Sequence, residues 1–236
     1  MIRKNFDIFI NINSEKIIIA IFKKNDGNCI FYKESDCLTN LATDKLNFLD
    51  TEKILEESII EAEKATGEFI NDINLMVETP ETMSVNLSVM HDNEEKQIDK
   101  KNVEYLIQDA KQQILRSYYN KKIIHIIVSN YFIDNVNYEL LPLNIKCKKF
   151  SIDIKFICFP KIIVNKLEQL FNNHHLLINN IICTEYVRSF FKNKIDSNIC
   201  KSGLRLVLGM NKQEVAIIPK KLERKGFFER LFHIFK

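Results

Sequence analysis

The sequence has little glycine and proline and no tryptophan: its 236 residues include five glycines and four prolines. Glycine-rich loops bind phosphate because a residue without Cβ lets backbone N–H groups close around the anion. A chain with so few glycines is therefore a poor candidate for an enzyme with phosphate loops. No Gly-x-Ser-x-Gly or Walker pattern is present either. We find no set of catalytic residues and do not expect an enzyme.

Long apolar runs and paired cysteines are also missing. No apolar run reaches about 18 residues, the length that a transmembrane helix needs. Asp7 interrupts any signal-peptide core near the N-terminus, so we expect a cytoplasmic chain. The six cysteines form no C-x-x-C pair, which favours buried thiols over a zinc site or a disulfide framework. With 46% hydrophobic residues, the chain can still bury a sizeable core in one or two domains.

Metal and nucleic-acid sites are not indicated. His174 and His175 have no carboxylate or cysteine at ligand spacing, and a helix end, where the dipole favours histidine, explains the pair better. Outside its basic C-terminal segment the chain is near neutral and contains no readable DNA- or RNA-binding motif. We therefore expect no metal and no nucleic acid as partners.

The C-terminal segment, Lys220 to Lys236, has the most distinctive composition. Six basic residues minus two acidic residues give it a charge of +4, whereas the whole chain carries +3. On a helix its phenylalanines and Leu231 fall on one side. Such a stripe usually belongs to a terminal helix packed on the protein's own core, but it is also a property of a helix lying in a membrane surface. Pro219 and Gly226 loosen its connection to the body, which favours the membrane. The predicted membrane-binding residues are Lys221, Arg224, Lys225, Phe227, Phe228, Arg230, Leu231, Phe232 and Phe235.

The first part of the chain predicts three strands, a helix and a fourth strand. Apolar runs at 6–12, 16–22 and 29–32 are separated by turn residues, which indicates a three-stranded meander. Asp50 or Thr51 is expected to cap a helix that Gly67 ends, and a strand follows at 73–77.

The middle of the chain reads as a separate βαββ unit. It comprises strands at 83–90, 123–132 and 150–159 and a helix that Asp99 caps. After Pro160 the pattern returns to a helix, a strand at 177–183 and a helix at 185–192. A short strand pair is expected at Leu204–Leu208 and Glu214–Ile218.

The predicted fold class is mixed α/β, with one unit inserted in another. We expect a discontinuous first domain at 1–80 and 160–200 and an inserted domain at 81–159. A remnant strand pair at 203–218 and the amphipathic helix at 219–236 complete the predicted organisation.

The order of these elements and several short stretches resemble the FtsA family of bacterial actin-like cell-division proteins. The segment Ile98–Val103 looks like the start of the helix in the family's inserted SHS2 domain. The run Ile123–Ile127, followed by Tyr131 and Asp134, is similar to its next strand, and Pro142–Ile145 to the turn after it. The similarity covers about residues 5–218. It implies an actin-like, ribonuclease H-like half with an inserted SHS2 domain and a C-terminal membrane helix.

The sequence departs from the family at both nucleotide loops. Family members bind ATP with loops of the types Asp-Ile-Gly-x-x-Lys and Asp-Ile-Gly-Gly-Gly-Thr. Here the corresponding segments are Asn11–Lys16 and Val207–Lys212, and both aspartates are absent. The resemblance therefore assigns a vestigial nucleotide site to Asn13, Ser14, Lys16 and Gly209, and we expect no cofactor, ATP included. Most of the second actin-like half also has no counterpart in this sequence.

The resemblance implies a shortened FtsA-like adaptor on the cytoplasmic face of the membrane, acting in cell division through protein contacts. Its expected partners are an anionic lipid surface and divisome proteins. Whether FtsZ is among them stays open, because family members tether FtsZ through their distal half. The oligomeric state is open for the same reason. The alternatives are a residual actin-like ATPase and an actin-like scaffold of pilus assembly.

Overall fold

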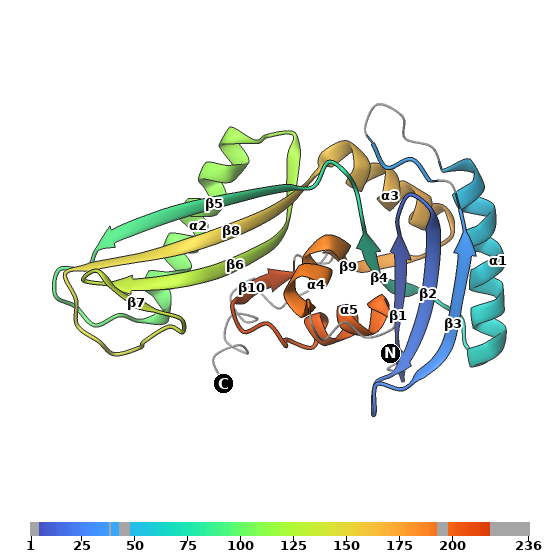
Figure 1. The fold of residues 1–236 in the computed structure, drawn as a ribbon, viewed down its shortest axis with the longest axis horizontal. Helices are drawn as coiled ribbons and strands as arrows, with labels where there is room; N and C mark the ends of the chain where they lie inside the picture. The colour runs from blue at the N-terminus through green and yellow to red at the C-terminus, as the bar shows by residue number, and fades with distance from the viewer. Residues whose placement is uncertain (1–4, 38, 43–47, 193–197, 218–236) are drawn as a thin grey trace. The chain divides into compact units, whose positions relative to one another are not determined.

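The computed structural model describes residues 5–37, 39–42, 48–192 and 198–217 (Figure 1). These residues fold into two compact units. Unit 1 contains the described residues of 1–82 and 159–210 together with Ile217, and unit 2 contains residues 83–158 and 211–216. The main segment of unit 2 is thus inserted between two segments of unit 1, with junctions at 82/83 and 158/159 where the sequence predicts 80/81 and 159/160.

Unit 1 is built on a five-stranded sheet of mixed direction. In chain order its strands are β1 (Phe6–Ile12), β2 (Lys16–Lys23), β3 (Cys29–Asp36), β4 (Asp72–Val77) and β9 (Leu177–Cys183). The spatial order is β3-β2-β1-β4-β9; β1 to β3 form an antiparallel meander, and β4 runs parallel to both β1 and β9. The predicted meander and fourth strand are present. This order and these directions are those of an actin-like, ribonuclease H-like half.

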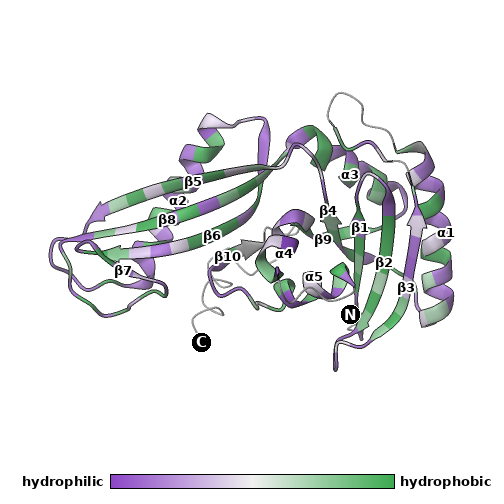
Figure 2. Cartoon of the chain, viewed as in Figure 1, coloured by the Kyte–Doolittle hydropathy of each residue, from purple (hydrophilic) through white to green (hydrophobic). Residues whose placement is uncertain are grey.

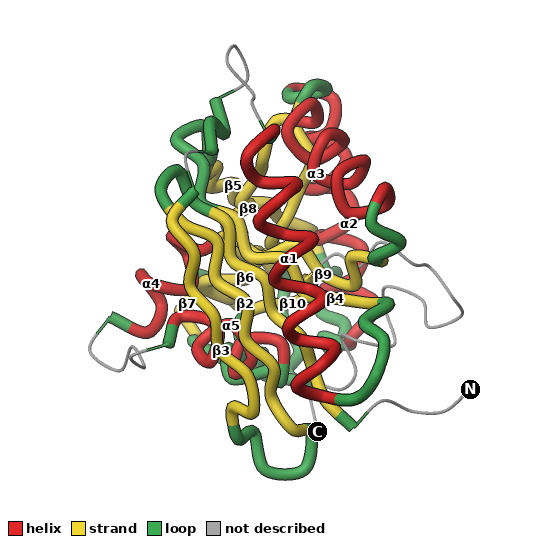
Figure 3. The backbone as a smooth tube through the Cα atoms, turned by 90° about the vertical axis from the view of Figure 1, so that its right-hand side faces the viewer, coloured by secondary structure: helices red, strands yellow, loops and turns green. Residues whose placement is uncertain are grey.

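Helices cover both faces of this sheet (Figures 1 and 3). They are α1 (Leu49–Thr66), α3 (Lys161–Asn173), α4 (Thr184–Phe191) and α5 (Ile199–Val207). The α1 face includes Lys33, whose ammonium group lies 2.8 Å from the Glu61 carboxylate. The opposite face includes Phe9 and Met76, against which α5 packs so closely that a Cβ on Gly203 would lie 2.5 Å from the Met76 sulfur. The central strands β1 and β2 are almost wholly buried. Figure 2 shows that their residues are mostly hydrophobic.

The predicted strand at Leu204–Leu208 is wrong, because this segment belongs to α5. The alternation of Leu204, Leu206 and Leu208 suggested a strand, yet only the first two are buried, and Leu208 is 72% exposed after the helix ends. Asn198 starts the helix by accepting a hydrogen bond from the Cys200 N–H at 2.9 Å. The burial of Cys200, Gly203 and Leu204 follows the helical period of three to four residues. The remnant strand pair expected at 203–218 is therefore not present as a pair.

Unit 2 has a helix lying on one face of a second sheet. Its elements are β5 (Met83–Asp92), α2 (Lys100–Ser117), β6 (Lys121–Ile133), β7 (Val136–Tyr138), β8 (Lys149–Pro160) and β10 (Glu214–Ile217). The strand order is β10-β6-β8-β5, with β7 paired to β6. As predicted, Asp99 caps α2: its side chain accepts from the Asn102 N–H at 3.0 Å, and the Asn102 side chain accepts from the Asp99 N–H at 2.8 Å.

The strand β10 joins this second sheet rather than pairing within its own segment. The Val128 N–H donates to the Gln213 carbonyl at 2.8 Å, and β10 lies beside β6. Next to this contact, His125 Nδ1 lies 2.5 Å from Glu214 Oε1, and both side chains are buried. Residues 211–216 therefore extend the inserted βαββ unit by one strand.

Within the described part of the chain, no helix combines the length and the apolar character needed to span a membrane.

A candidate binding pocket in unit 1

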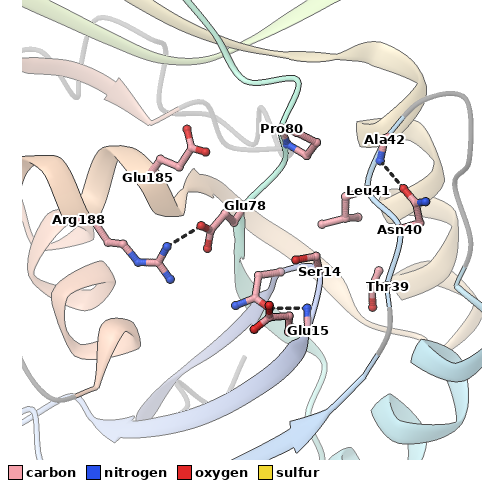
Figure 4. Close-up of a pocket in the computed structure, with 11 residues that line it drawn as sticks. Ser14, Glu15, Thr39, Asn40, Leu41, Ala42, Glu78, Pro80, Glu185 and Arg188 are labelled. Atoms are coloured by element: carbon pink, nitrogen blue, oxygen red, sulfur yellow. Dashed lines mark hydrogen bonds and ion pairs between the residues drawn. The ribbon is translucent and has the colours of Figure 1, made fainter.

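Unit 1 contains a cavity of about 840 Å³ at the end of its central strands (Figure 4). Four segments form its wall: the β1–β2 turn, residues 39–42, the residues after β4, and the start of α4. The lining residues are Asn13, Ser14, Glu15, Thr39, Asn40, Leu41, Ala42, Glu78, Pro80, Glu185 and Arg188. Because β4 and β9 are parallel, Glu78 and Glu185 follow strand ends that meet at one edge of the sheet, the usual place for a ligand site in such folds.

The β1–β2 turn is closed by the side chain of Asn13 rather than by glycine. Asn13 Oδ1 accepts from the backbone N–H groups of Glu15 at 2.9 Å and Lys16 at 2.8 Å, and the Asn13 N–H donates to the Lys16 carbonyl at 3.1 Å. In a phosphate loop such N–H groups point at the ligand. Here they are used within the turn itself, so they are not available to an anion.

Residues 39–42 form another wall of the pocket and are hydrogen-bonded to the β1–β2 turn and to the segment after β4. The Thr39 N–H donates to the Ser14 carbonyl at 3.2 Å, and the Thr79 hydroxyl donates to the Leu41 carbonyl at 2.9 Å. The Ala42 N–H donates to Asn40 Oδ1 at 3.0 Å. These bonds fix a polar wall without relying on a glycine.

The charge of the lining is acidic. Among the described lining residues it includes the carboxylates of Glu15, Glu78 and Glu185 and a single cation, Arg188, whose Nη1 donates to Glu78 Oε1 at 2.6 Å (Figure 4). Burial raises the pKa of the Glu185 carboxyl, the neighbouring charge of Glu78 raises it further, and Arg188 opposes both. This arrangement suits a cationic group better than a phosphate.

Asn11, which the resemblance aligns with the first aspartate of the FtsA family, precedes the turn near the end of β1. Its side chain is fully buried, and its Oδ1 accepts a hydrogen bond from the Thr184 hydroxyl at 2.7 Å. Its Nδ2 has no hydrogen-bond partner among the described atoms. A neutral amide at this point cannot supply the carboxylate that a metal-linked phosphate requires.

The structure brings together only part of the predicted nucleotide set. Asn13 and Ser14 line the pocket. The Lys16 ammonium group instead pairs with Glu34 on β3, which raises its pKa, and Lys16 is not among the lining residues. Gly209 is also outside the lining; it ends α5 with a left-handed φ of 84°.

Sequence reasoning missed Glu78, Glu185 and Arg188. The signal was present, because Glu78 and Glu185 directly follow two predicted strands of the same domain, but the sequence does not reveal that these strands are parallel neighbours.

Two further predictions concern other parts of the chain. The membrane-binding residues Lys221, Arg224, Lys225, Phe227, Phe228, Arg230, Leu231, Phe232 and Phe235 lie outside the described residues. Among the described residues, no group of three or more histidine, cysteine, aspartate or glutamate side chains is placed to hold a metal ion.

The fold therefore combines an actin-like half with an inserted subdomain, and the expected mixed α/β class is confirmed. Residues 80–158 match the model of the SHS2 domain inserted in FtsA. No curated protein matches the chain in sequence.

Three of the solved structures that match this chain do so at low identity. The PilM–PilN type IV pilus biogenesis complex matches at 7% identity with a TM-score of 0.48, covering 78% of this chain and 49% of that one. The cytoplasmic domain of EpsL, an inner membrane component of the type II secretion system of Vibrio cholerae, matches at 6% identity with a TM-score of 0.37. The match covers 77% of this chain and 57% of that one. A Bacteroides thetaiotaomicron protein with an actin-like ATPase fold and unknown function matches at 12% identity with a TM-score of 0.31. The match covers 79% of this chain and 56% of that one. The chain thus spans about half the length of the structures it matches.

Proposed function

We propose that this protein is an FtsA-like adaptor of the cell-division machinery, held at the inner face of the cytoplasmic membrane and acting through protein contacts without binding ATP. The observation that carries the proposal is the match of residues 80–158 to the SHS2 domain inserted in FtsA. The actin-like order of the first sheet surrounds this insertion as it does in the family.

The chemistry of the unit 1 pocket supports an adaptor without nucleotide. The turn uses its own N–H groups, and the described lining carries three carboxylates against one paired arginine. An amide, Asn11, stands where the resemblance places an aspartate. Each feature disfavours a triphosphate: the first removes donors, the second repels negative charge, and the third removes a group that would hold its metal ion.

The composition of Lys220 to Lys236 supports the membrane part of the proposal. Near an anionic surface each lysine or arginine contributes about 1 kcal/mol, and each well-buried phenylalanine or leucine adds about 1.5 kcal/mol or more. A segment with a charge of +4 and a phenylalanine-rich side would therefore bind anionic lipid reversibly. In this account the segment supplies attachment, and the SHS2 subdomain supplies a surface for divisome proteins.

Localisation of a fluorescent fusion of the full chain in dividing cells tests the cell-division role. We expect a band at the division site for the natural chain and diffuse fluorescence for Phe232→Asp. Phe69→Asp is the matched control, because it makes the same change at a phenylalanine that is 79% exposed in the described body; it should keep the band. Uniform peripheral fluorescence would leave membrane attachment intact but contradict the division role.

A further inference from the structure

The strand β5 forms an open edge of the unit 2 sheet. All ten of its residues pair with β8 in an unbroken antiparallel register, from Met83 opposite Cys158 to Asp92 opposite Lys149. The strand order places β5 last, and no other described strand pairs with its outer side. Its outer backbone N–H and C=O groups therefore face away from the sheet, as a template for another strand.

This edge lacks the usual protection against strand pairing. It contains no proline, lysine, arginine or bulge, and its only charged residue is Asp92 at the very end. Two other sheet edges in the described structure differ: β3 carries Lys33, Glu34 and Asp36, and β10 has only four residues. The remaining edge, β9, is also uncharged, but with seven residues it is shorter than β5 with ten. Natural proteins blunt exposed edges with charges, proline or short length, so a long uncharged edge indicates a strand meant to be paired.

The sequence of β5 is almost a palindrome. Val85-Asn86-Leu87-Ser88-Val89 reads nearly the same in both directions around Leu87. A two-fold contact between identical strands needs a self-complementary surface, because each residue meets its counterpart across the axis. Antiparallel pairing about Leu87 places Val85 opposite Val89, Leu87 opposite Leu87, and Asn86 opposite Ser88.

We propose that β5 pairs with β5 of a second copy of this chain, antiparallel and centred on Leu87, to join two unit 2 sheets into one. In this register Val85, Leu87 and Val89 meet aliphatic residues on the face that α2 covers, and Asn86 meets Ser88 on the other face. The pairing with β8 shows which face of the sheet each β5 side chain lies on, because directly paired residues share a face. The buried β8 residues on the α2 face are Phe156, Ile154 and Ile152, and they pair with Val85, Leu87 and Val89 respectively.

The charges also fit a second copy. Asp92 of one copy falls opposite Thr82 of the other, so no like charges face each other across the pair. Beside the edge, Asp153 is already engaged, since it accepts from Ser88 at 2.5 Å and from Asn130 at 3.2 Å. A strand from an unrelated partner would have no need for the palindrome, and it is the alternative outcome of the tests below.

A charge test uses Ser84 and Met90, which are exposed and would face each other across the axis. We expect a concentration-dependent dimer of the natural chain in sedimentation equilibrium without lipid. The variant Ser84→Lys/Met90→Lys should dissociate about tenfold more readily, because like charges then face each other at two places across the axis and the natural contacts are lost. The variant Ser84→Glu/Met90→Glu should dissociate more readily than the natural chain to a similar extent, for the same reason. Mixing the two variants should restore the dimer, which also shows that both have folded.

A crosslinking test fixes the register, in a Cys29→Ser background because Cys29 is the exposed natural thiol among the six cysteines. Oxidised Leu87→Cys should form a covalent dimer. Val85→Cys is the matched control, since its two copies would lie about 13 Å apart along the strands, beyond the reach of a disulfide. A natural chain that is monomeric at every concentration overturns the proposal. So does a dimer that neither charge variant weakens, or one that crosslinks at Val85 but not at Leu87.

Discussion

The Thr184 hydroxyl at the start of α4 donates a hydrogen bond to Asn11 Oδ1 on β1 over 2.7 Å, joining positions 173 residues apart in the chain. Both side chains are fully buried. The bond connects the strand that leads into the pocket turn with the helix that carries Glu185 and Arg188. It involves Asn11, which the sequence resemblance aligns with a nucleotide-site aspartate of the FtsA family.

Thr184→Val should lower the free energy of unfolding by about 1–3 kcal/mol, because the substitution leaves a buried amide oxygen without its donor. Thr184→Ser keeps the hydroxyl and should lose much less. Urea denaturation of the three proteins measures the difference. Equal stability of the valine variant and the natural chain would contradict a stabilising role for this bond.

Mg-ATP should leave the melting temperature unchanged. A ligand present at a hundred times its dissociation constant stabilises the folded state by about 2.7 kcal/mol, so binding at this site would be visible as a clear shift. The control is magnesium alone at matched ionic strength. A rise of several degrees that depends on ATP concentration would support the residual ATPase instead of the adaptor.

Glu185→Gln should stabilise the protein more at pH 7 than at pH 4. The folded-state pKa of Glu185 is raised, chiefly by burial. Its carboxyl is protonated in both states below its ordinary pKa, and the natural chain loses stability as the pH rises from there through the folded-state pKa. Glutamine resembles the protonated form and removes this loss. Urea denaturation at both pH values checks the sign, with Glu57→Gln on the exposed side of α1 as control; the prediction fails if the two glutamine variants respond to pH identically.

Glu214→Ala should destabilise unit 2 by about 1–3 kcal/mol, because the fully buried His125 ring then loses its 2.5 Å partner. Gln213→Ala, one residue away and half-buried, is the matched control and should change little. Hydrogen exchange of the β6 amides distinguishes the two variants. Unchanged protection in Glu214→Ala would mean that the side chain does not hold β10 against β6.

Sequence patterns within short stretches predicted most of the helices and strands. They could not predict which strands pair when these are far apart in the chain. The β1–β2–β3 meander and the Asp99 cap follow from turn residues and helical spacing within short stretches. The error at Leu204–Leu208 arose because alternating leucines suit a strand, whereas packing against Phe9 and Met76 selects a helix with Gly203 at the contact. Periodicity also cannot indicate which sheet a short strand joins, and β10 joins the unit 2 sheet.

The candidate site was predictable only in part, for a related reason. Asn13 and Ser14 were found because they follow a strand in a family-like turn. The carboxylates of Glu78 and Glu185 come from residues 107 positions apart, and only the parallel pairing of β4 with β9 brings their strand ends to one edge. The Asn13 side chain's use of the turn N–H groups is likewise a matter of three-dimensional geometry.

Co-sedimentation of the full chain with vesicles tests the membrane adaptor most directly. We predict that the natural chain and Phe69→Asp pellet with anionic vesicles, that Phe232→Asp stays largely in the supernatant, and that neutral vesicles bind all three weakly. If the natural chain and Phe232→Asp pellet equally, or if neither pellets, attachment through Lys220 to Lys236 is contradicted.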